Sequence, residues 1–130
     1  MNKPITEAMI LVVDDDALIR DHVAALLVSS GYRVTSVGSS REALELVAAG
    51  FAPELLLTDV WIAAGMNGIE LAREAQRVLP GLKVLFFSGH INATGREQLP
   101  KGAEFLQKPF RRLQCIEKVR SVLTASPALN

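Results

Sequence analysis

Three continuous apolar runs constrain the fold of this chain more than any other feature. They span Met9–Val13, Leu55–Thr58 and Leu82–Phe87, and each is followed by polar residues. Strands that alternate apolar and polar residues expose one face to water, whereas uninterrupted runs are typical of parallel strands covered on both faces. Two weaker strands are predicted at Arg33–Val37 and Glu104–Leu106.

Helical patterns separate the predicted strands. The predicted helices are Ala17–Ser30, closed by Gly31; a second between Ser39 and Gly50; a third between Asn67 and Pro80; and a last from Phe110 to Leu123. The second and third open with capping-box spacings, Ser39 with Glu42 and Asn67 with Glu70. The third is expected to bury Ile69, Leu71, Ala72, Ala75, Val78 and Leu79, and the last to bury Leu113, Ile116, Val119 and Leu123.

This alternation of strands and helices predicts a doubly wound α/β sheet. In such folds the ligand site lies beyond the carboxyl ends of the strands, at the point where the strand order reverses. The residues that follow each strand are therefore the first candidates for function.

The composition excludes several classes of protein. The 14 lysines and arginines equal the 14 aspartates and glutamates, so no basic surplus is available for nucleic-acid phosphates. No apolar stretch approaches the roughly 20 residues that span a bilayer, and the first ten residues do not read as a secretory signal. Cys115, the single cysteine, is interpreted as a small apolar residue in a reducing compartment. We therefore expect a cytoplasmic protein that binds neither nucleic acid directly nor membranes.

Polar side chains follow four of the predicted strands. They are Asp14, Asp15 and Asp16 after the first strand, Asp59 after the third, Ser88 after the fourth and Lys108 after the fifth. Carboxylates with few nitrogen or sulfur neighbours favour a hard divalent cation, above all Mg²⁺. Such a cation accepts phosphoryl oxygens while a lysine and a hydroxyl hold the others, which leaves one carboxylate as a nucleophile.

Each of these residues alone has a simpler interpretation. Acidic residues before a helix are favourable as caps and first-turn charges, which accounts for one or two of the triplet. Asp59 alone is equally a turn residue, Ser88 a turn hydroxyl and Lys108 a solvated surface charge. Their joint occurrence at strand ends is what favours a phosphoryl site.

Four segments carry a resemblance to a known family: ILVVDDD, LLLTDVW with the following GMNGIEL, VLFFSG and FLQKPF. From about Met9 to Leu123 the chain resembles the CheY-like receiver domain of bacterial two-component response regulators, most of all receivers of hybrid histidine kinases. The resemblance implies a flavodoxin-like sheet of five parallel strands in the order 2-1-3-4-5. Residues 1–130 are then expected to form one domain, with a core of about 9–123 and short flexible tails.

The resemblance also implies roles for individual residues. The expected phosphoacceptor is Asp59, and the expected Mg²⁺ ligands are Asp14 (through water), Asp15, Asp59 and the backbone carbonyl of Trp61. Ser88 and Phe105 are the expected switch residues, Lys108 the cation that pairs with the phosphate, and Asp16 a charge at the start of a helix. The Lys108–Pro109 peptide is expected to be cis.

The sequence departs from the family pattern in the loop after Asp59 and in the segment 89–103. Ala63 stands where the family usually has proline, and Phe105 where some members have tyrosine or histidine. Because the segment contains Gly95, Pro100 and Gly102, the fourth helix is expected to be short or irregular. A downstream protein is expected to bind the face formed by this segment, the fifth strand and the last helix.

Two residues bear on how long a phosphoryl group would last. Trp61 lies two residues after Asp59, and His90 two residues after Ser88. One hypothesis is that the indole screens the acyl phosphate from water; the alternative is that it packs on its loop. His90 is either a general base for hydrolysis or a loop histidine without a role.

Three functions follow from this reasoning. The leading hypothesis is a receiver that takes a phosphoryl group from a histidine kinase or phosphotransfer protein onto Asp59 and then changes its partner binding. It would be consumed as a substrate and is not expected to be an enzyme. The alternatives are a small haloacid-dehalogenase-like phosphatase, which uses Asp14 and Asp16 and leaves Asp59 unexplained, and a degenerate receiver acting as a scaffold. A stand-alone regulator is favoured over a domain of a longer kinase.

Overall fold

The computed structural model describes residues 8–62, 66–89, 99 and 103–125. In chain order the elements are β1 (Met9–Val13), α1 (Ala17–Ser29), β2 (Arg33–Val37), α2 (Ser40–Ala48), β3 (Leu55–Asp59), α3 (Gly68–Val78), β4 (Lys83–Ser88), β5 (Glu104–Gln107) and α5 (Arg112–Thr124). Ala63 and nearly all of the segment expected to form an irregular fourth helix lie outside the described residues.

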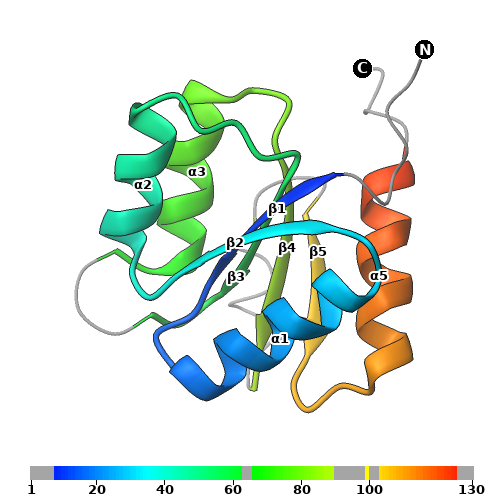
Figure 1. The fold of residues 1–130 in the computed structure, drawn as a ribbon. Helices are drawn as coiled ribbons and strands as arrows, with labels where there is room; N and C mark the ends of the chain where they lie inside the picture. Colours follow the sequence, from blue (N-terminus) through cyan, green and yellow to red (C-terminus); the bar gives the residue numbers. More distant parts are fainter. Residues whose placement is uncertain (1–7, 63–65, 90–98, 100–102, 126–130) are drawn as a thin grey trace.

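The five strands form one parallel sheet in the order β2-β1-β3-β4-β5, which confirms the predicted topology (Figure 1). The register pairs Val13 with both Val37 and Thr58, and Asp59 with Phe87. The last residues of the central strands therefore lie side by side at one edge of the sheet. Asp59 and Ser88 prove to be the final residues of their strands rather than the first residues after them.

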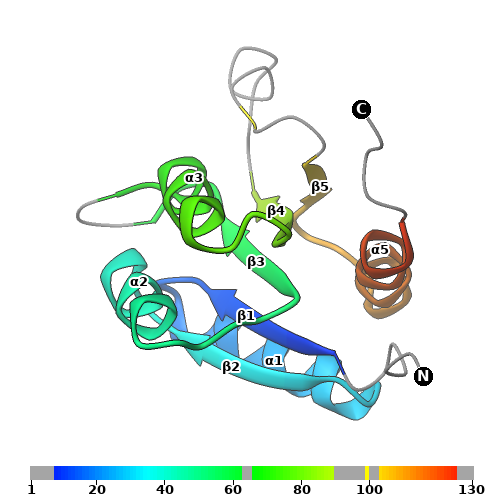
Figure 2. The same cartoon turned by 90° about the horizontal axis from the view of Figure 1, so that it is seen from above.

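Helices cover both faces of the sheet, as the uninterrupted apolar strands predict (Figure 2). Ile10 and Val12 of β1 point to the side of α1 and α5 and belong to one core cluster. Leu11 and Val13 point to the side of α2 and α3 and belong to the other. Each central strand thus buries both sets of side chains.

Side chains cap the starts of α1, α2 and α3 at the predicted residues; at α2, Ser39 accepts from the backbone N–H of Glu42, but the return bond of the predicted capping box is not formed. Asp16 accepts hydrogen bonds from the backbone N–H groups of Leu18 and Ile19, so it serves as the start-of-helix charge. Asn67 and Glu70 form the full reciprocal capping box of α3. Gly31 and Gly50 follow α1 and α2 with positive φ angles of 98° and 105°.

Two predicted core residues are exposed instead. Leu113 lies two residues before the buried Cys115, about 200° around α5 from it, so it points to solvent. Val78 ends α3, and Leu79 packs against the core in its place. Cys115 is fully buried and burial raises the pKa of its thiol to about 11, in keeping with its predicted role as an apolar residue. Among the described helices, none is long and apolar enough to span a membrane.

Candidate functional site

Three carboxylates meet at the carboxyl edge of the sheet. Asp14 and Asp15 follow β1, and Asp59 ends β3. One oxygen of each lies within 4.8 Å of the others, so the three form a single cluster. Asp14 is only 1 % exposed, while Asp15 is exposed and opens the cluster to solvent.

Asp59 is held at both of its carboxylate oxygens. Its Oδ1 accepts a hydrogen bond of 3.0 Å from the backbone N–H of Trp61, and its Oδ2 accepts one of 2.9 Å from the Lys108 ammonium. Trp61 therefore lies beside Asp59 as predicted, although its predicted role as a carbonyl ligand stays a prediction.

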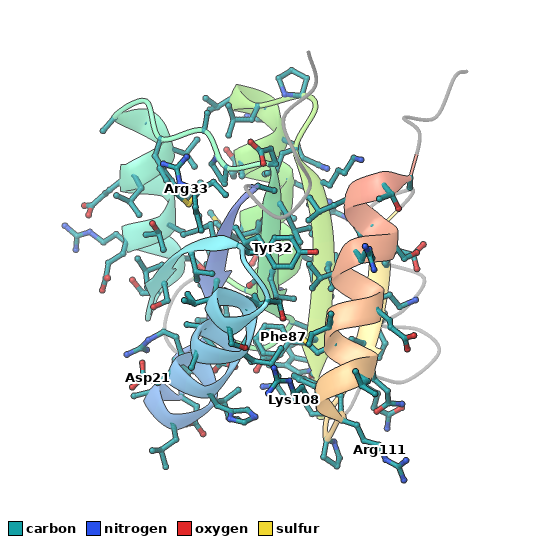
Figure 3. All side chains as sticks on the ribbon, turned by 45° about the vertical axis from the view of Figure 1, so that its right-hand side comes forward. Asp21, Tyr32, Arg33, Phe87, Lys108 and Arg111 are labelled. Carbon is teal, nitrogen blue, oxygen red and sulfur yellow. The ribbon has the colours of Figure 1, made fainter. Side chains whose placement is uncertain are left out.

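Lys108 joins the two buried carboxylates of the cluster. Its Nζ lies 3.0 Å from Asp14 Oδ2 and 2.9 Å from Asp59 Oδ2. The ammonium also lies 4.6 Å from the ring centre of the buried Phe87, which favours a positive charge at this place. Figure 3 shows Phe87 and Lys108 next to each other between α1 and α5. The Lys108–Pro109 peptide is cis, as expected.

The surroundings change the acid–base properties of this group of residues. Burial raises the pKa of Asp14, and this effect exceeds the opposite effects of the Asp16 backbone N–H and of Lys108. Burial acts to lower the pKa of Lys108, but its hydrogen bonds to Asp59 and Asp14 raise it above the ordinary value. Lys108 therefore stays charged at neutral pH and offsets part of the negative charge of Asp14 and Asp59.

Two of the remaining predicted residues, Ser88 and Phe105, lie on the neighbouring strands β4 and β5. Ser88 is buried, and its carbonyl oxygen accepts a hydrogen bond of 2.8 Å from the backbone N–H of Lys108. Phe105 is half-buried on β5 and packs against the core cluster on the α2–α3 side. His90 lies outside the described residues.

Sequence reasoning missed Gly68, at the first position of α3. A side chain there would place its Cβ 2.0 Å from the carbonyl oxygen of Asp59, so only glycine fits this close approach. The hydroxyl of Thr58 donates to the same oxygen at 3.0 Å. The spacing of Gly68 from Asp59 in the sequence was visible, but no local pattern indicated the contact.

The donor set of the cluster fits a hard divalent cation. All three residues offer carboxylate oxygens, and no nitrogen or sulfur ligand belongs to the cluster among the described residues. Oxygen-only sites of this kind suit Mg²⁺, which retains several waters and takes few protein ligands. The exposed Asp15 leaves room for such waters on the solvent side.

Comparison with known proteins shows which family shares this arrangement. Residues 10–120 match the response regulator receiver domain family, which is most of the chain. The chain belongs to this family. As a receiver domain, it is a regulatory module of two-component signalling, in which receivers work with histidine kinases and effector domains.

The receiver resembles both short and long proteins. It is 33% identical over 120 residues to the response regulator receiver protein CpdR of Brucella abortus, covering 90% of this chain and 98% of that protein. It is also 33% identical to the sensor kinase CckA of the same organism, but the match covers 89% of this chain and only 12% of the kinase. The crystal structure of a response regulator receiver protein from Sinorhizobium medicae has a TM-score of 0.85 at 28% identity, with 94% of this chain and 98% of that chain covered.

The family match bears on the alternatives as well. It confirms the predicted fold and the resemblance to receivers, and it does not favour the haloacid-dehalogenase-like phosphatase. The structure agrees, since Asp59, which the phosphatase hypothesis leaves unexplained, lies inside the acidic cluster.

Proposed function

We propose that this receiver accepts a phosphoryl group on Asp59 with Mg²⁺ bound to the acidic cluster, and that it acts as a substrate and switch rather than as an enzyme. The observation that carries the proposal is the position of Asp59. It is buried in contact with Lys108, and it shares a cluster of potential ligands with Asp14 and Asp15. A carboxylate in this position is both a nucleophile and part of a phosphate site.

Each side chain of the cluster has a task in the transfer. A carboxylate oxygen of Asp59 forms the new bond to phosphorus while the bond between phosphorus and the donor's histidine nitrogen breaks. Lys108 lies at 2.9 Å from Asp59 and supplies positive charge where the phosphoryl oxygens arrive. Asp14, Asp15, Asp59 and the carbonyl of Trp61 would hold Mg²⁺, which supplies further charge stabilisation for the transferring group.

The product changes the balance of contacts at the edge of the sheet. A dianionic phosphoryl group competes with Asp14 for the ammonium of Lys108 and draws the hydroxyl of Ser88 toward it. Because the Lys108 backbone N–H is bonded to the Ser88 carbonyl, the ends of β4 and β5 move together. Phe105 on β5 and the downstream-binding face beside it then shift between two states.

The first test is the intact mass of the protein after incubation with acetyl phosphate, with and without Mg²⁺. Wild type should gain one phosphoryl group only with Mg²⁺, and Asp59→Asn should gain none. A gain that survives Asp59→Asn would show that the nucleophile is another residue, and Asp14→Asn would be tested next. Steady turnover of a phosphomonoester by the wild type would instead support the phosphatase.

The phosphodonor protein is proposed to dock on a groove beside Lys108. The groove measures about 580 Å³ and is lined by α1 and by the residues after β5, among them His22, Pro109 and Phe110. Leu18 is on its lining and is 83 % exposed, which is unusual for a leucine this close to a charged site. A helix of a histidine kinase or phosphotransfer protein would cover this apolar surface and bring its phosphohistidine to Asp59.

Leu18→Asp tests the docking surface. Transfer from a phosphorylated kinase that reacts with the wild type should slow strongly, while phosphorylation by acetyl phosphate stays unchanged. Val28→Asp is the matched control, since Val28 is 56 % exposed near the far end of the same helix. Equal effects of the two variants would contradict docking at this groove.

Trp61 and His90 are proposed to set the lifetime of the phosphoryl group. Trp61 is 57 % exposed beside Asp59, so its indole is available to screen the acyl phosphate. Trp61→Asn should speed dephosphorylation, and Val78→Asn, at an equally exposed residue at the end of α3, should not. An unchanged rate in Trp61→Asn would remove the screening hypothesis.

A further inference from the structure

Arg20 contacts the acidic cluster through the backbone of Asp14. Its Nη1 donates a hydrogen bond of 2.9 Å to the carbonyl oxygen of Asp14. Arg20 is the fourth residue of α1, six residues after Asp14 in the sequence, and it is half-buried. The guanidinium therefore grips the peptide group that joins Asp14 to Asp15.

This contact completes the fixation of Asp14. Its N–H donates to the Val37 carbonyl at 3.3 Å, its Oδ1 accepts from the Asp16 N–H at 2.9 Å, and its Oδ2 accepts from Lys108 at 3.0 Å. With Arg20 on the carbonyl, all four polar atoms of Asp14 are engaged. Among these partners, Arg20 is the one that is hydrogen-bonded to the peptide group between Asp14 and Asp15. Asp15 itself is exposed.

Gly38 provides the space that Arg20 occupies. A Cβ at Gly38 would lie 3.0 Å from Arg20 Nη1 and 3.8 Å from its Cζ. The backbone of Gly38 does not have a positive φ angle, so the turn itself does not require glycine. Glycine at this position leaves the guanidinium where it is, whereas a Cβ would oblige it to shift by a few tenths of an ångström.

We propose that Arg20 is a positioning residue for the cation and phosphoryl site and that Gly38 keeps its place open. Arg20 holds the Asp14–Asp15 peptide so that both carboxylates are presented toward Asp59. This inference rests on the proposed Mg²⁺-dependent function of the acidic cluster. Groups that orient metal ligands typically change metal affinity by about 10- to 100-fold.

The sign of the effect separates positioning from simple charge. Removing a positive charge next to three carboxylates strengthens cation binding if only long-range electrostatics matter. Removing the support of the Asp14–Asp15 peptide weakens it. Arg20→Ala should therefore bind Mg²⁺ more weakly, in spite of losing a positive charge.

The experiment is a Mg²⁺ titration followed by the fluorescence of Trp61, the single tryptophan, and independently by calorimetry. Arg20→Ala should raise the dissociation constant about tenfold. Arg20→Lys, which keeps a donor and the charge but not the planar fork, should raise it less. Circular dichroism checks that each variant is folded, and phosphorylation by acetyl phosphate at saturating Mg²⁺ should recover toward the wild-type rate.

Gly38→Ala tests the same contact without touching Arg20. Its methyl group should shift the guanidinium by a few tenths of an ångström and so weaken Mg²⁺ binding, but it should add nothing in an Arg20→Ala background. Gly81→Ala, where a Cβ meets no atom within 4 Å, is the matched control.

Unchanged or tighter Mg²⁺ binding in both Arg20→Ala and Gly38→Ala overturns the inference, as do additive effects in the double variant. If Arg20→Ala does not fold, Gly38→Ala alone decides. A wild type that binds no Mg²⁺ overturns the proposed function itself.

Discussion

The two edges of the sheet use charged residues in opposite ways. Where β1 and β4 begin, Glu54 Oε2 accepts a hydrogen bond from the Met9 N–H, and Lys83 Nζ donates to the carbonyls of Leu123 and Ala125 at the end of α5. These charges satisfy backbone groups that no helix or strand would otherwise satisfy. At the edge where the strands end, charged side chains meet one another instead.

The difference distinguishes structural from functional polarity. At the carboxyl edge, Asp14 and Asp59 share Lys108, and the carboxylate of Asp15 lies in the same cluster, so three like charges are held close together. Such an arrangement is unfavourable for folding alone, because like charges repel and buried carboxylates lose hydration. It is favourable once a divalent cation or a phosphoryl group binds. The charged groups of the amino edge should therefore contribute to stability, and those of the carboxyl edge to activity.

The largest effect is expected at Gly68 of the carboxyl edge. Gly68→Ala forces the Asp59 backbone and α3 apart, since the new Cβ would lie 2.0 Å from the Asp59 carbonyl oxygen. Overpacking of this kind lowers the free energy of unfolding by about 3 kcal/mol, and phosphorylation should slow because Asp59 moves. Urea unfolding and the acetyl phosphate assay measure the two effects.

Gly81, near the amino edge, gives the matched control. A methyl group there meets nothing within 4 Å and the φ angle is not positive, so Gly81→Ala should leave activity unchanged. It should stabilise the fold by about 0.5 kcal/mol, by reducing the freedom of the unfolded chain. Equal losses of stability in the two variants would show that the close approach at Gly68 is not special.

The next effect is expected at Glu54. Glu54→Ala removes the acceptor of the Met9 N–H and should lower the free energy of unfolding by about 1–2 kcal/mol. The dissociation constant for Mg²⁺ should stay at the wild-type value, because β1 is still paired on both sides. A change in Mg²⁺ affinity that exceeds the change in stability would break the division between the two edges.

Asp14→Asn should differ from Glu54→Ala in both measurements, with a higher stability and a lower Mg²⁺ affinity than the wild type. Because burial raises the pKa of Asp14, folding disfavours its ionised form, and a neutral amide of the same shape removes that penalty. The variant should be more stable by about 1 kcal/mol without Mg²⁺, and its Mg²⁺ affinity should fall more than about tenfold. Reduced stability in urea unfolding would show that the ion pair with Lys108 outweighs the burial of the charge.

Which of these features the sequence could predict depends on whether they are local. The central strands were predictable because a run such as Ile10–Val13 is apolar without interruption, and the caps at Asp16 and Asn67 because their partners are two or three residues away. The meeting of Asp14, Asp59 and Lys108 was predictable because the topology brings the ends of parallel strands together.

Other contacts could not be predicted because they join segments whose relative position only packing determines. Lys83 reaches the end of α5 across 40 residues, and the Cβ-free face of Gly68 matters only once α3 is placed against Asp59. The exposure of Leu113 has the same origin, since the orientation of α5 selects Cys115, Val119 and Val122 for burial. Helical periodicity identified a stripe but not which of its edges faces the sheet.

The pH dependence of stability gives the finest test of the comparison. The unfolded Asp14 titrates near 3.8, and burial against the partly opposing effect of Lys108 raises its pKa in the folded state, with Asp59 adding to the rise. Between these two values the native state binds more protons than the unfolded state, so the contribution of Asp14 to stability is present at low pH and is lost as the pH rises through the folded pKa.

The advantage of Asp14→Asn over wild type should therefore be largest at pH 7 without Mg²⁺ and shrink as the pH falls toward 3.8. Gly81→Ala removes no titratable group, so its difference from wild type should stay constant over the same range. An advantage of Asp14→Asn that is equally constant would mean that the stabilisation comes from packing rather than from the buried charge, and the carboxyl edge would then differ from the amino edge in geometry alone.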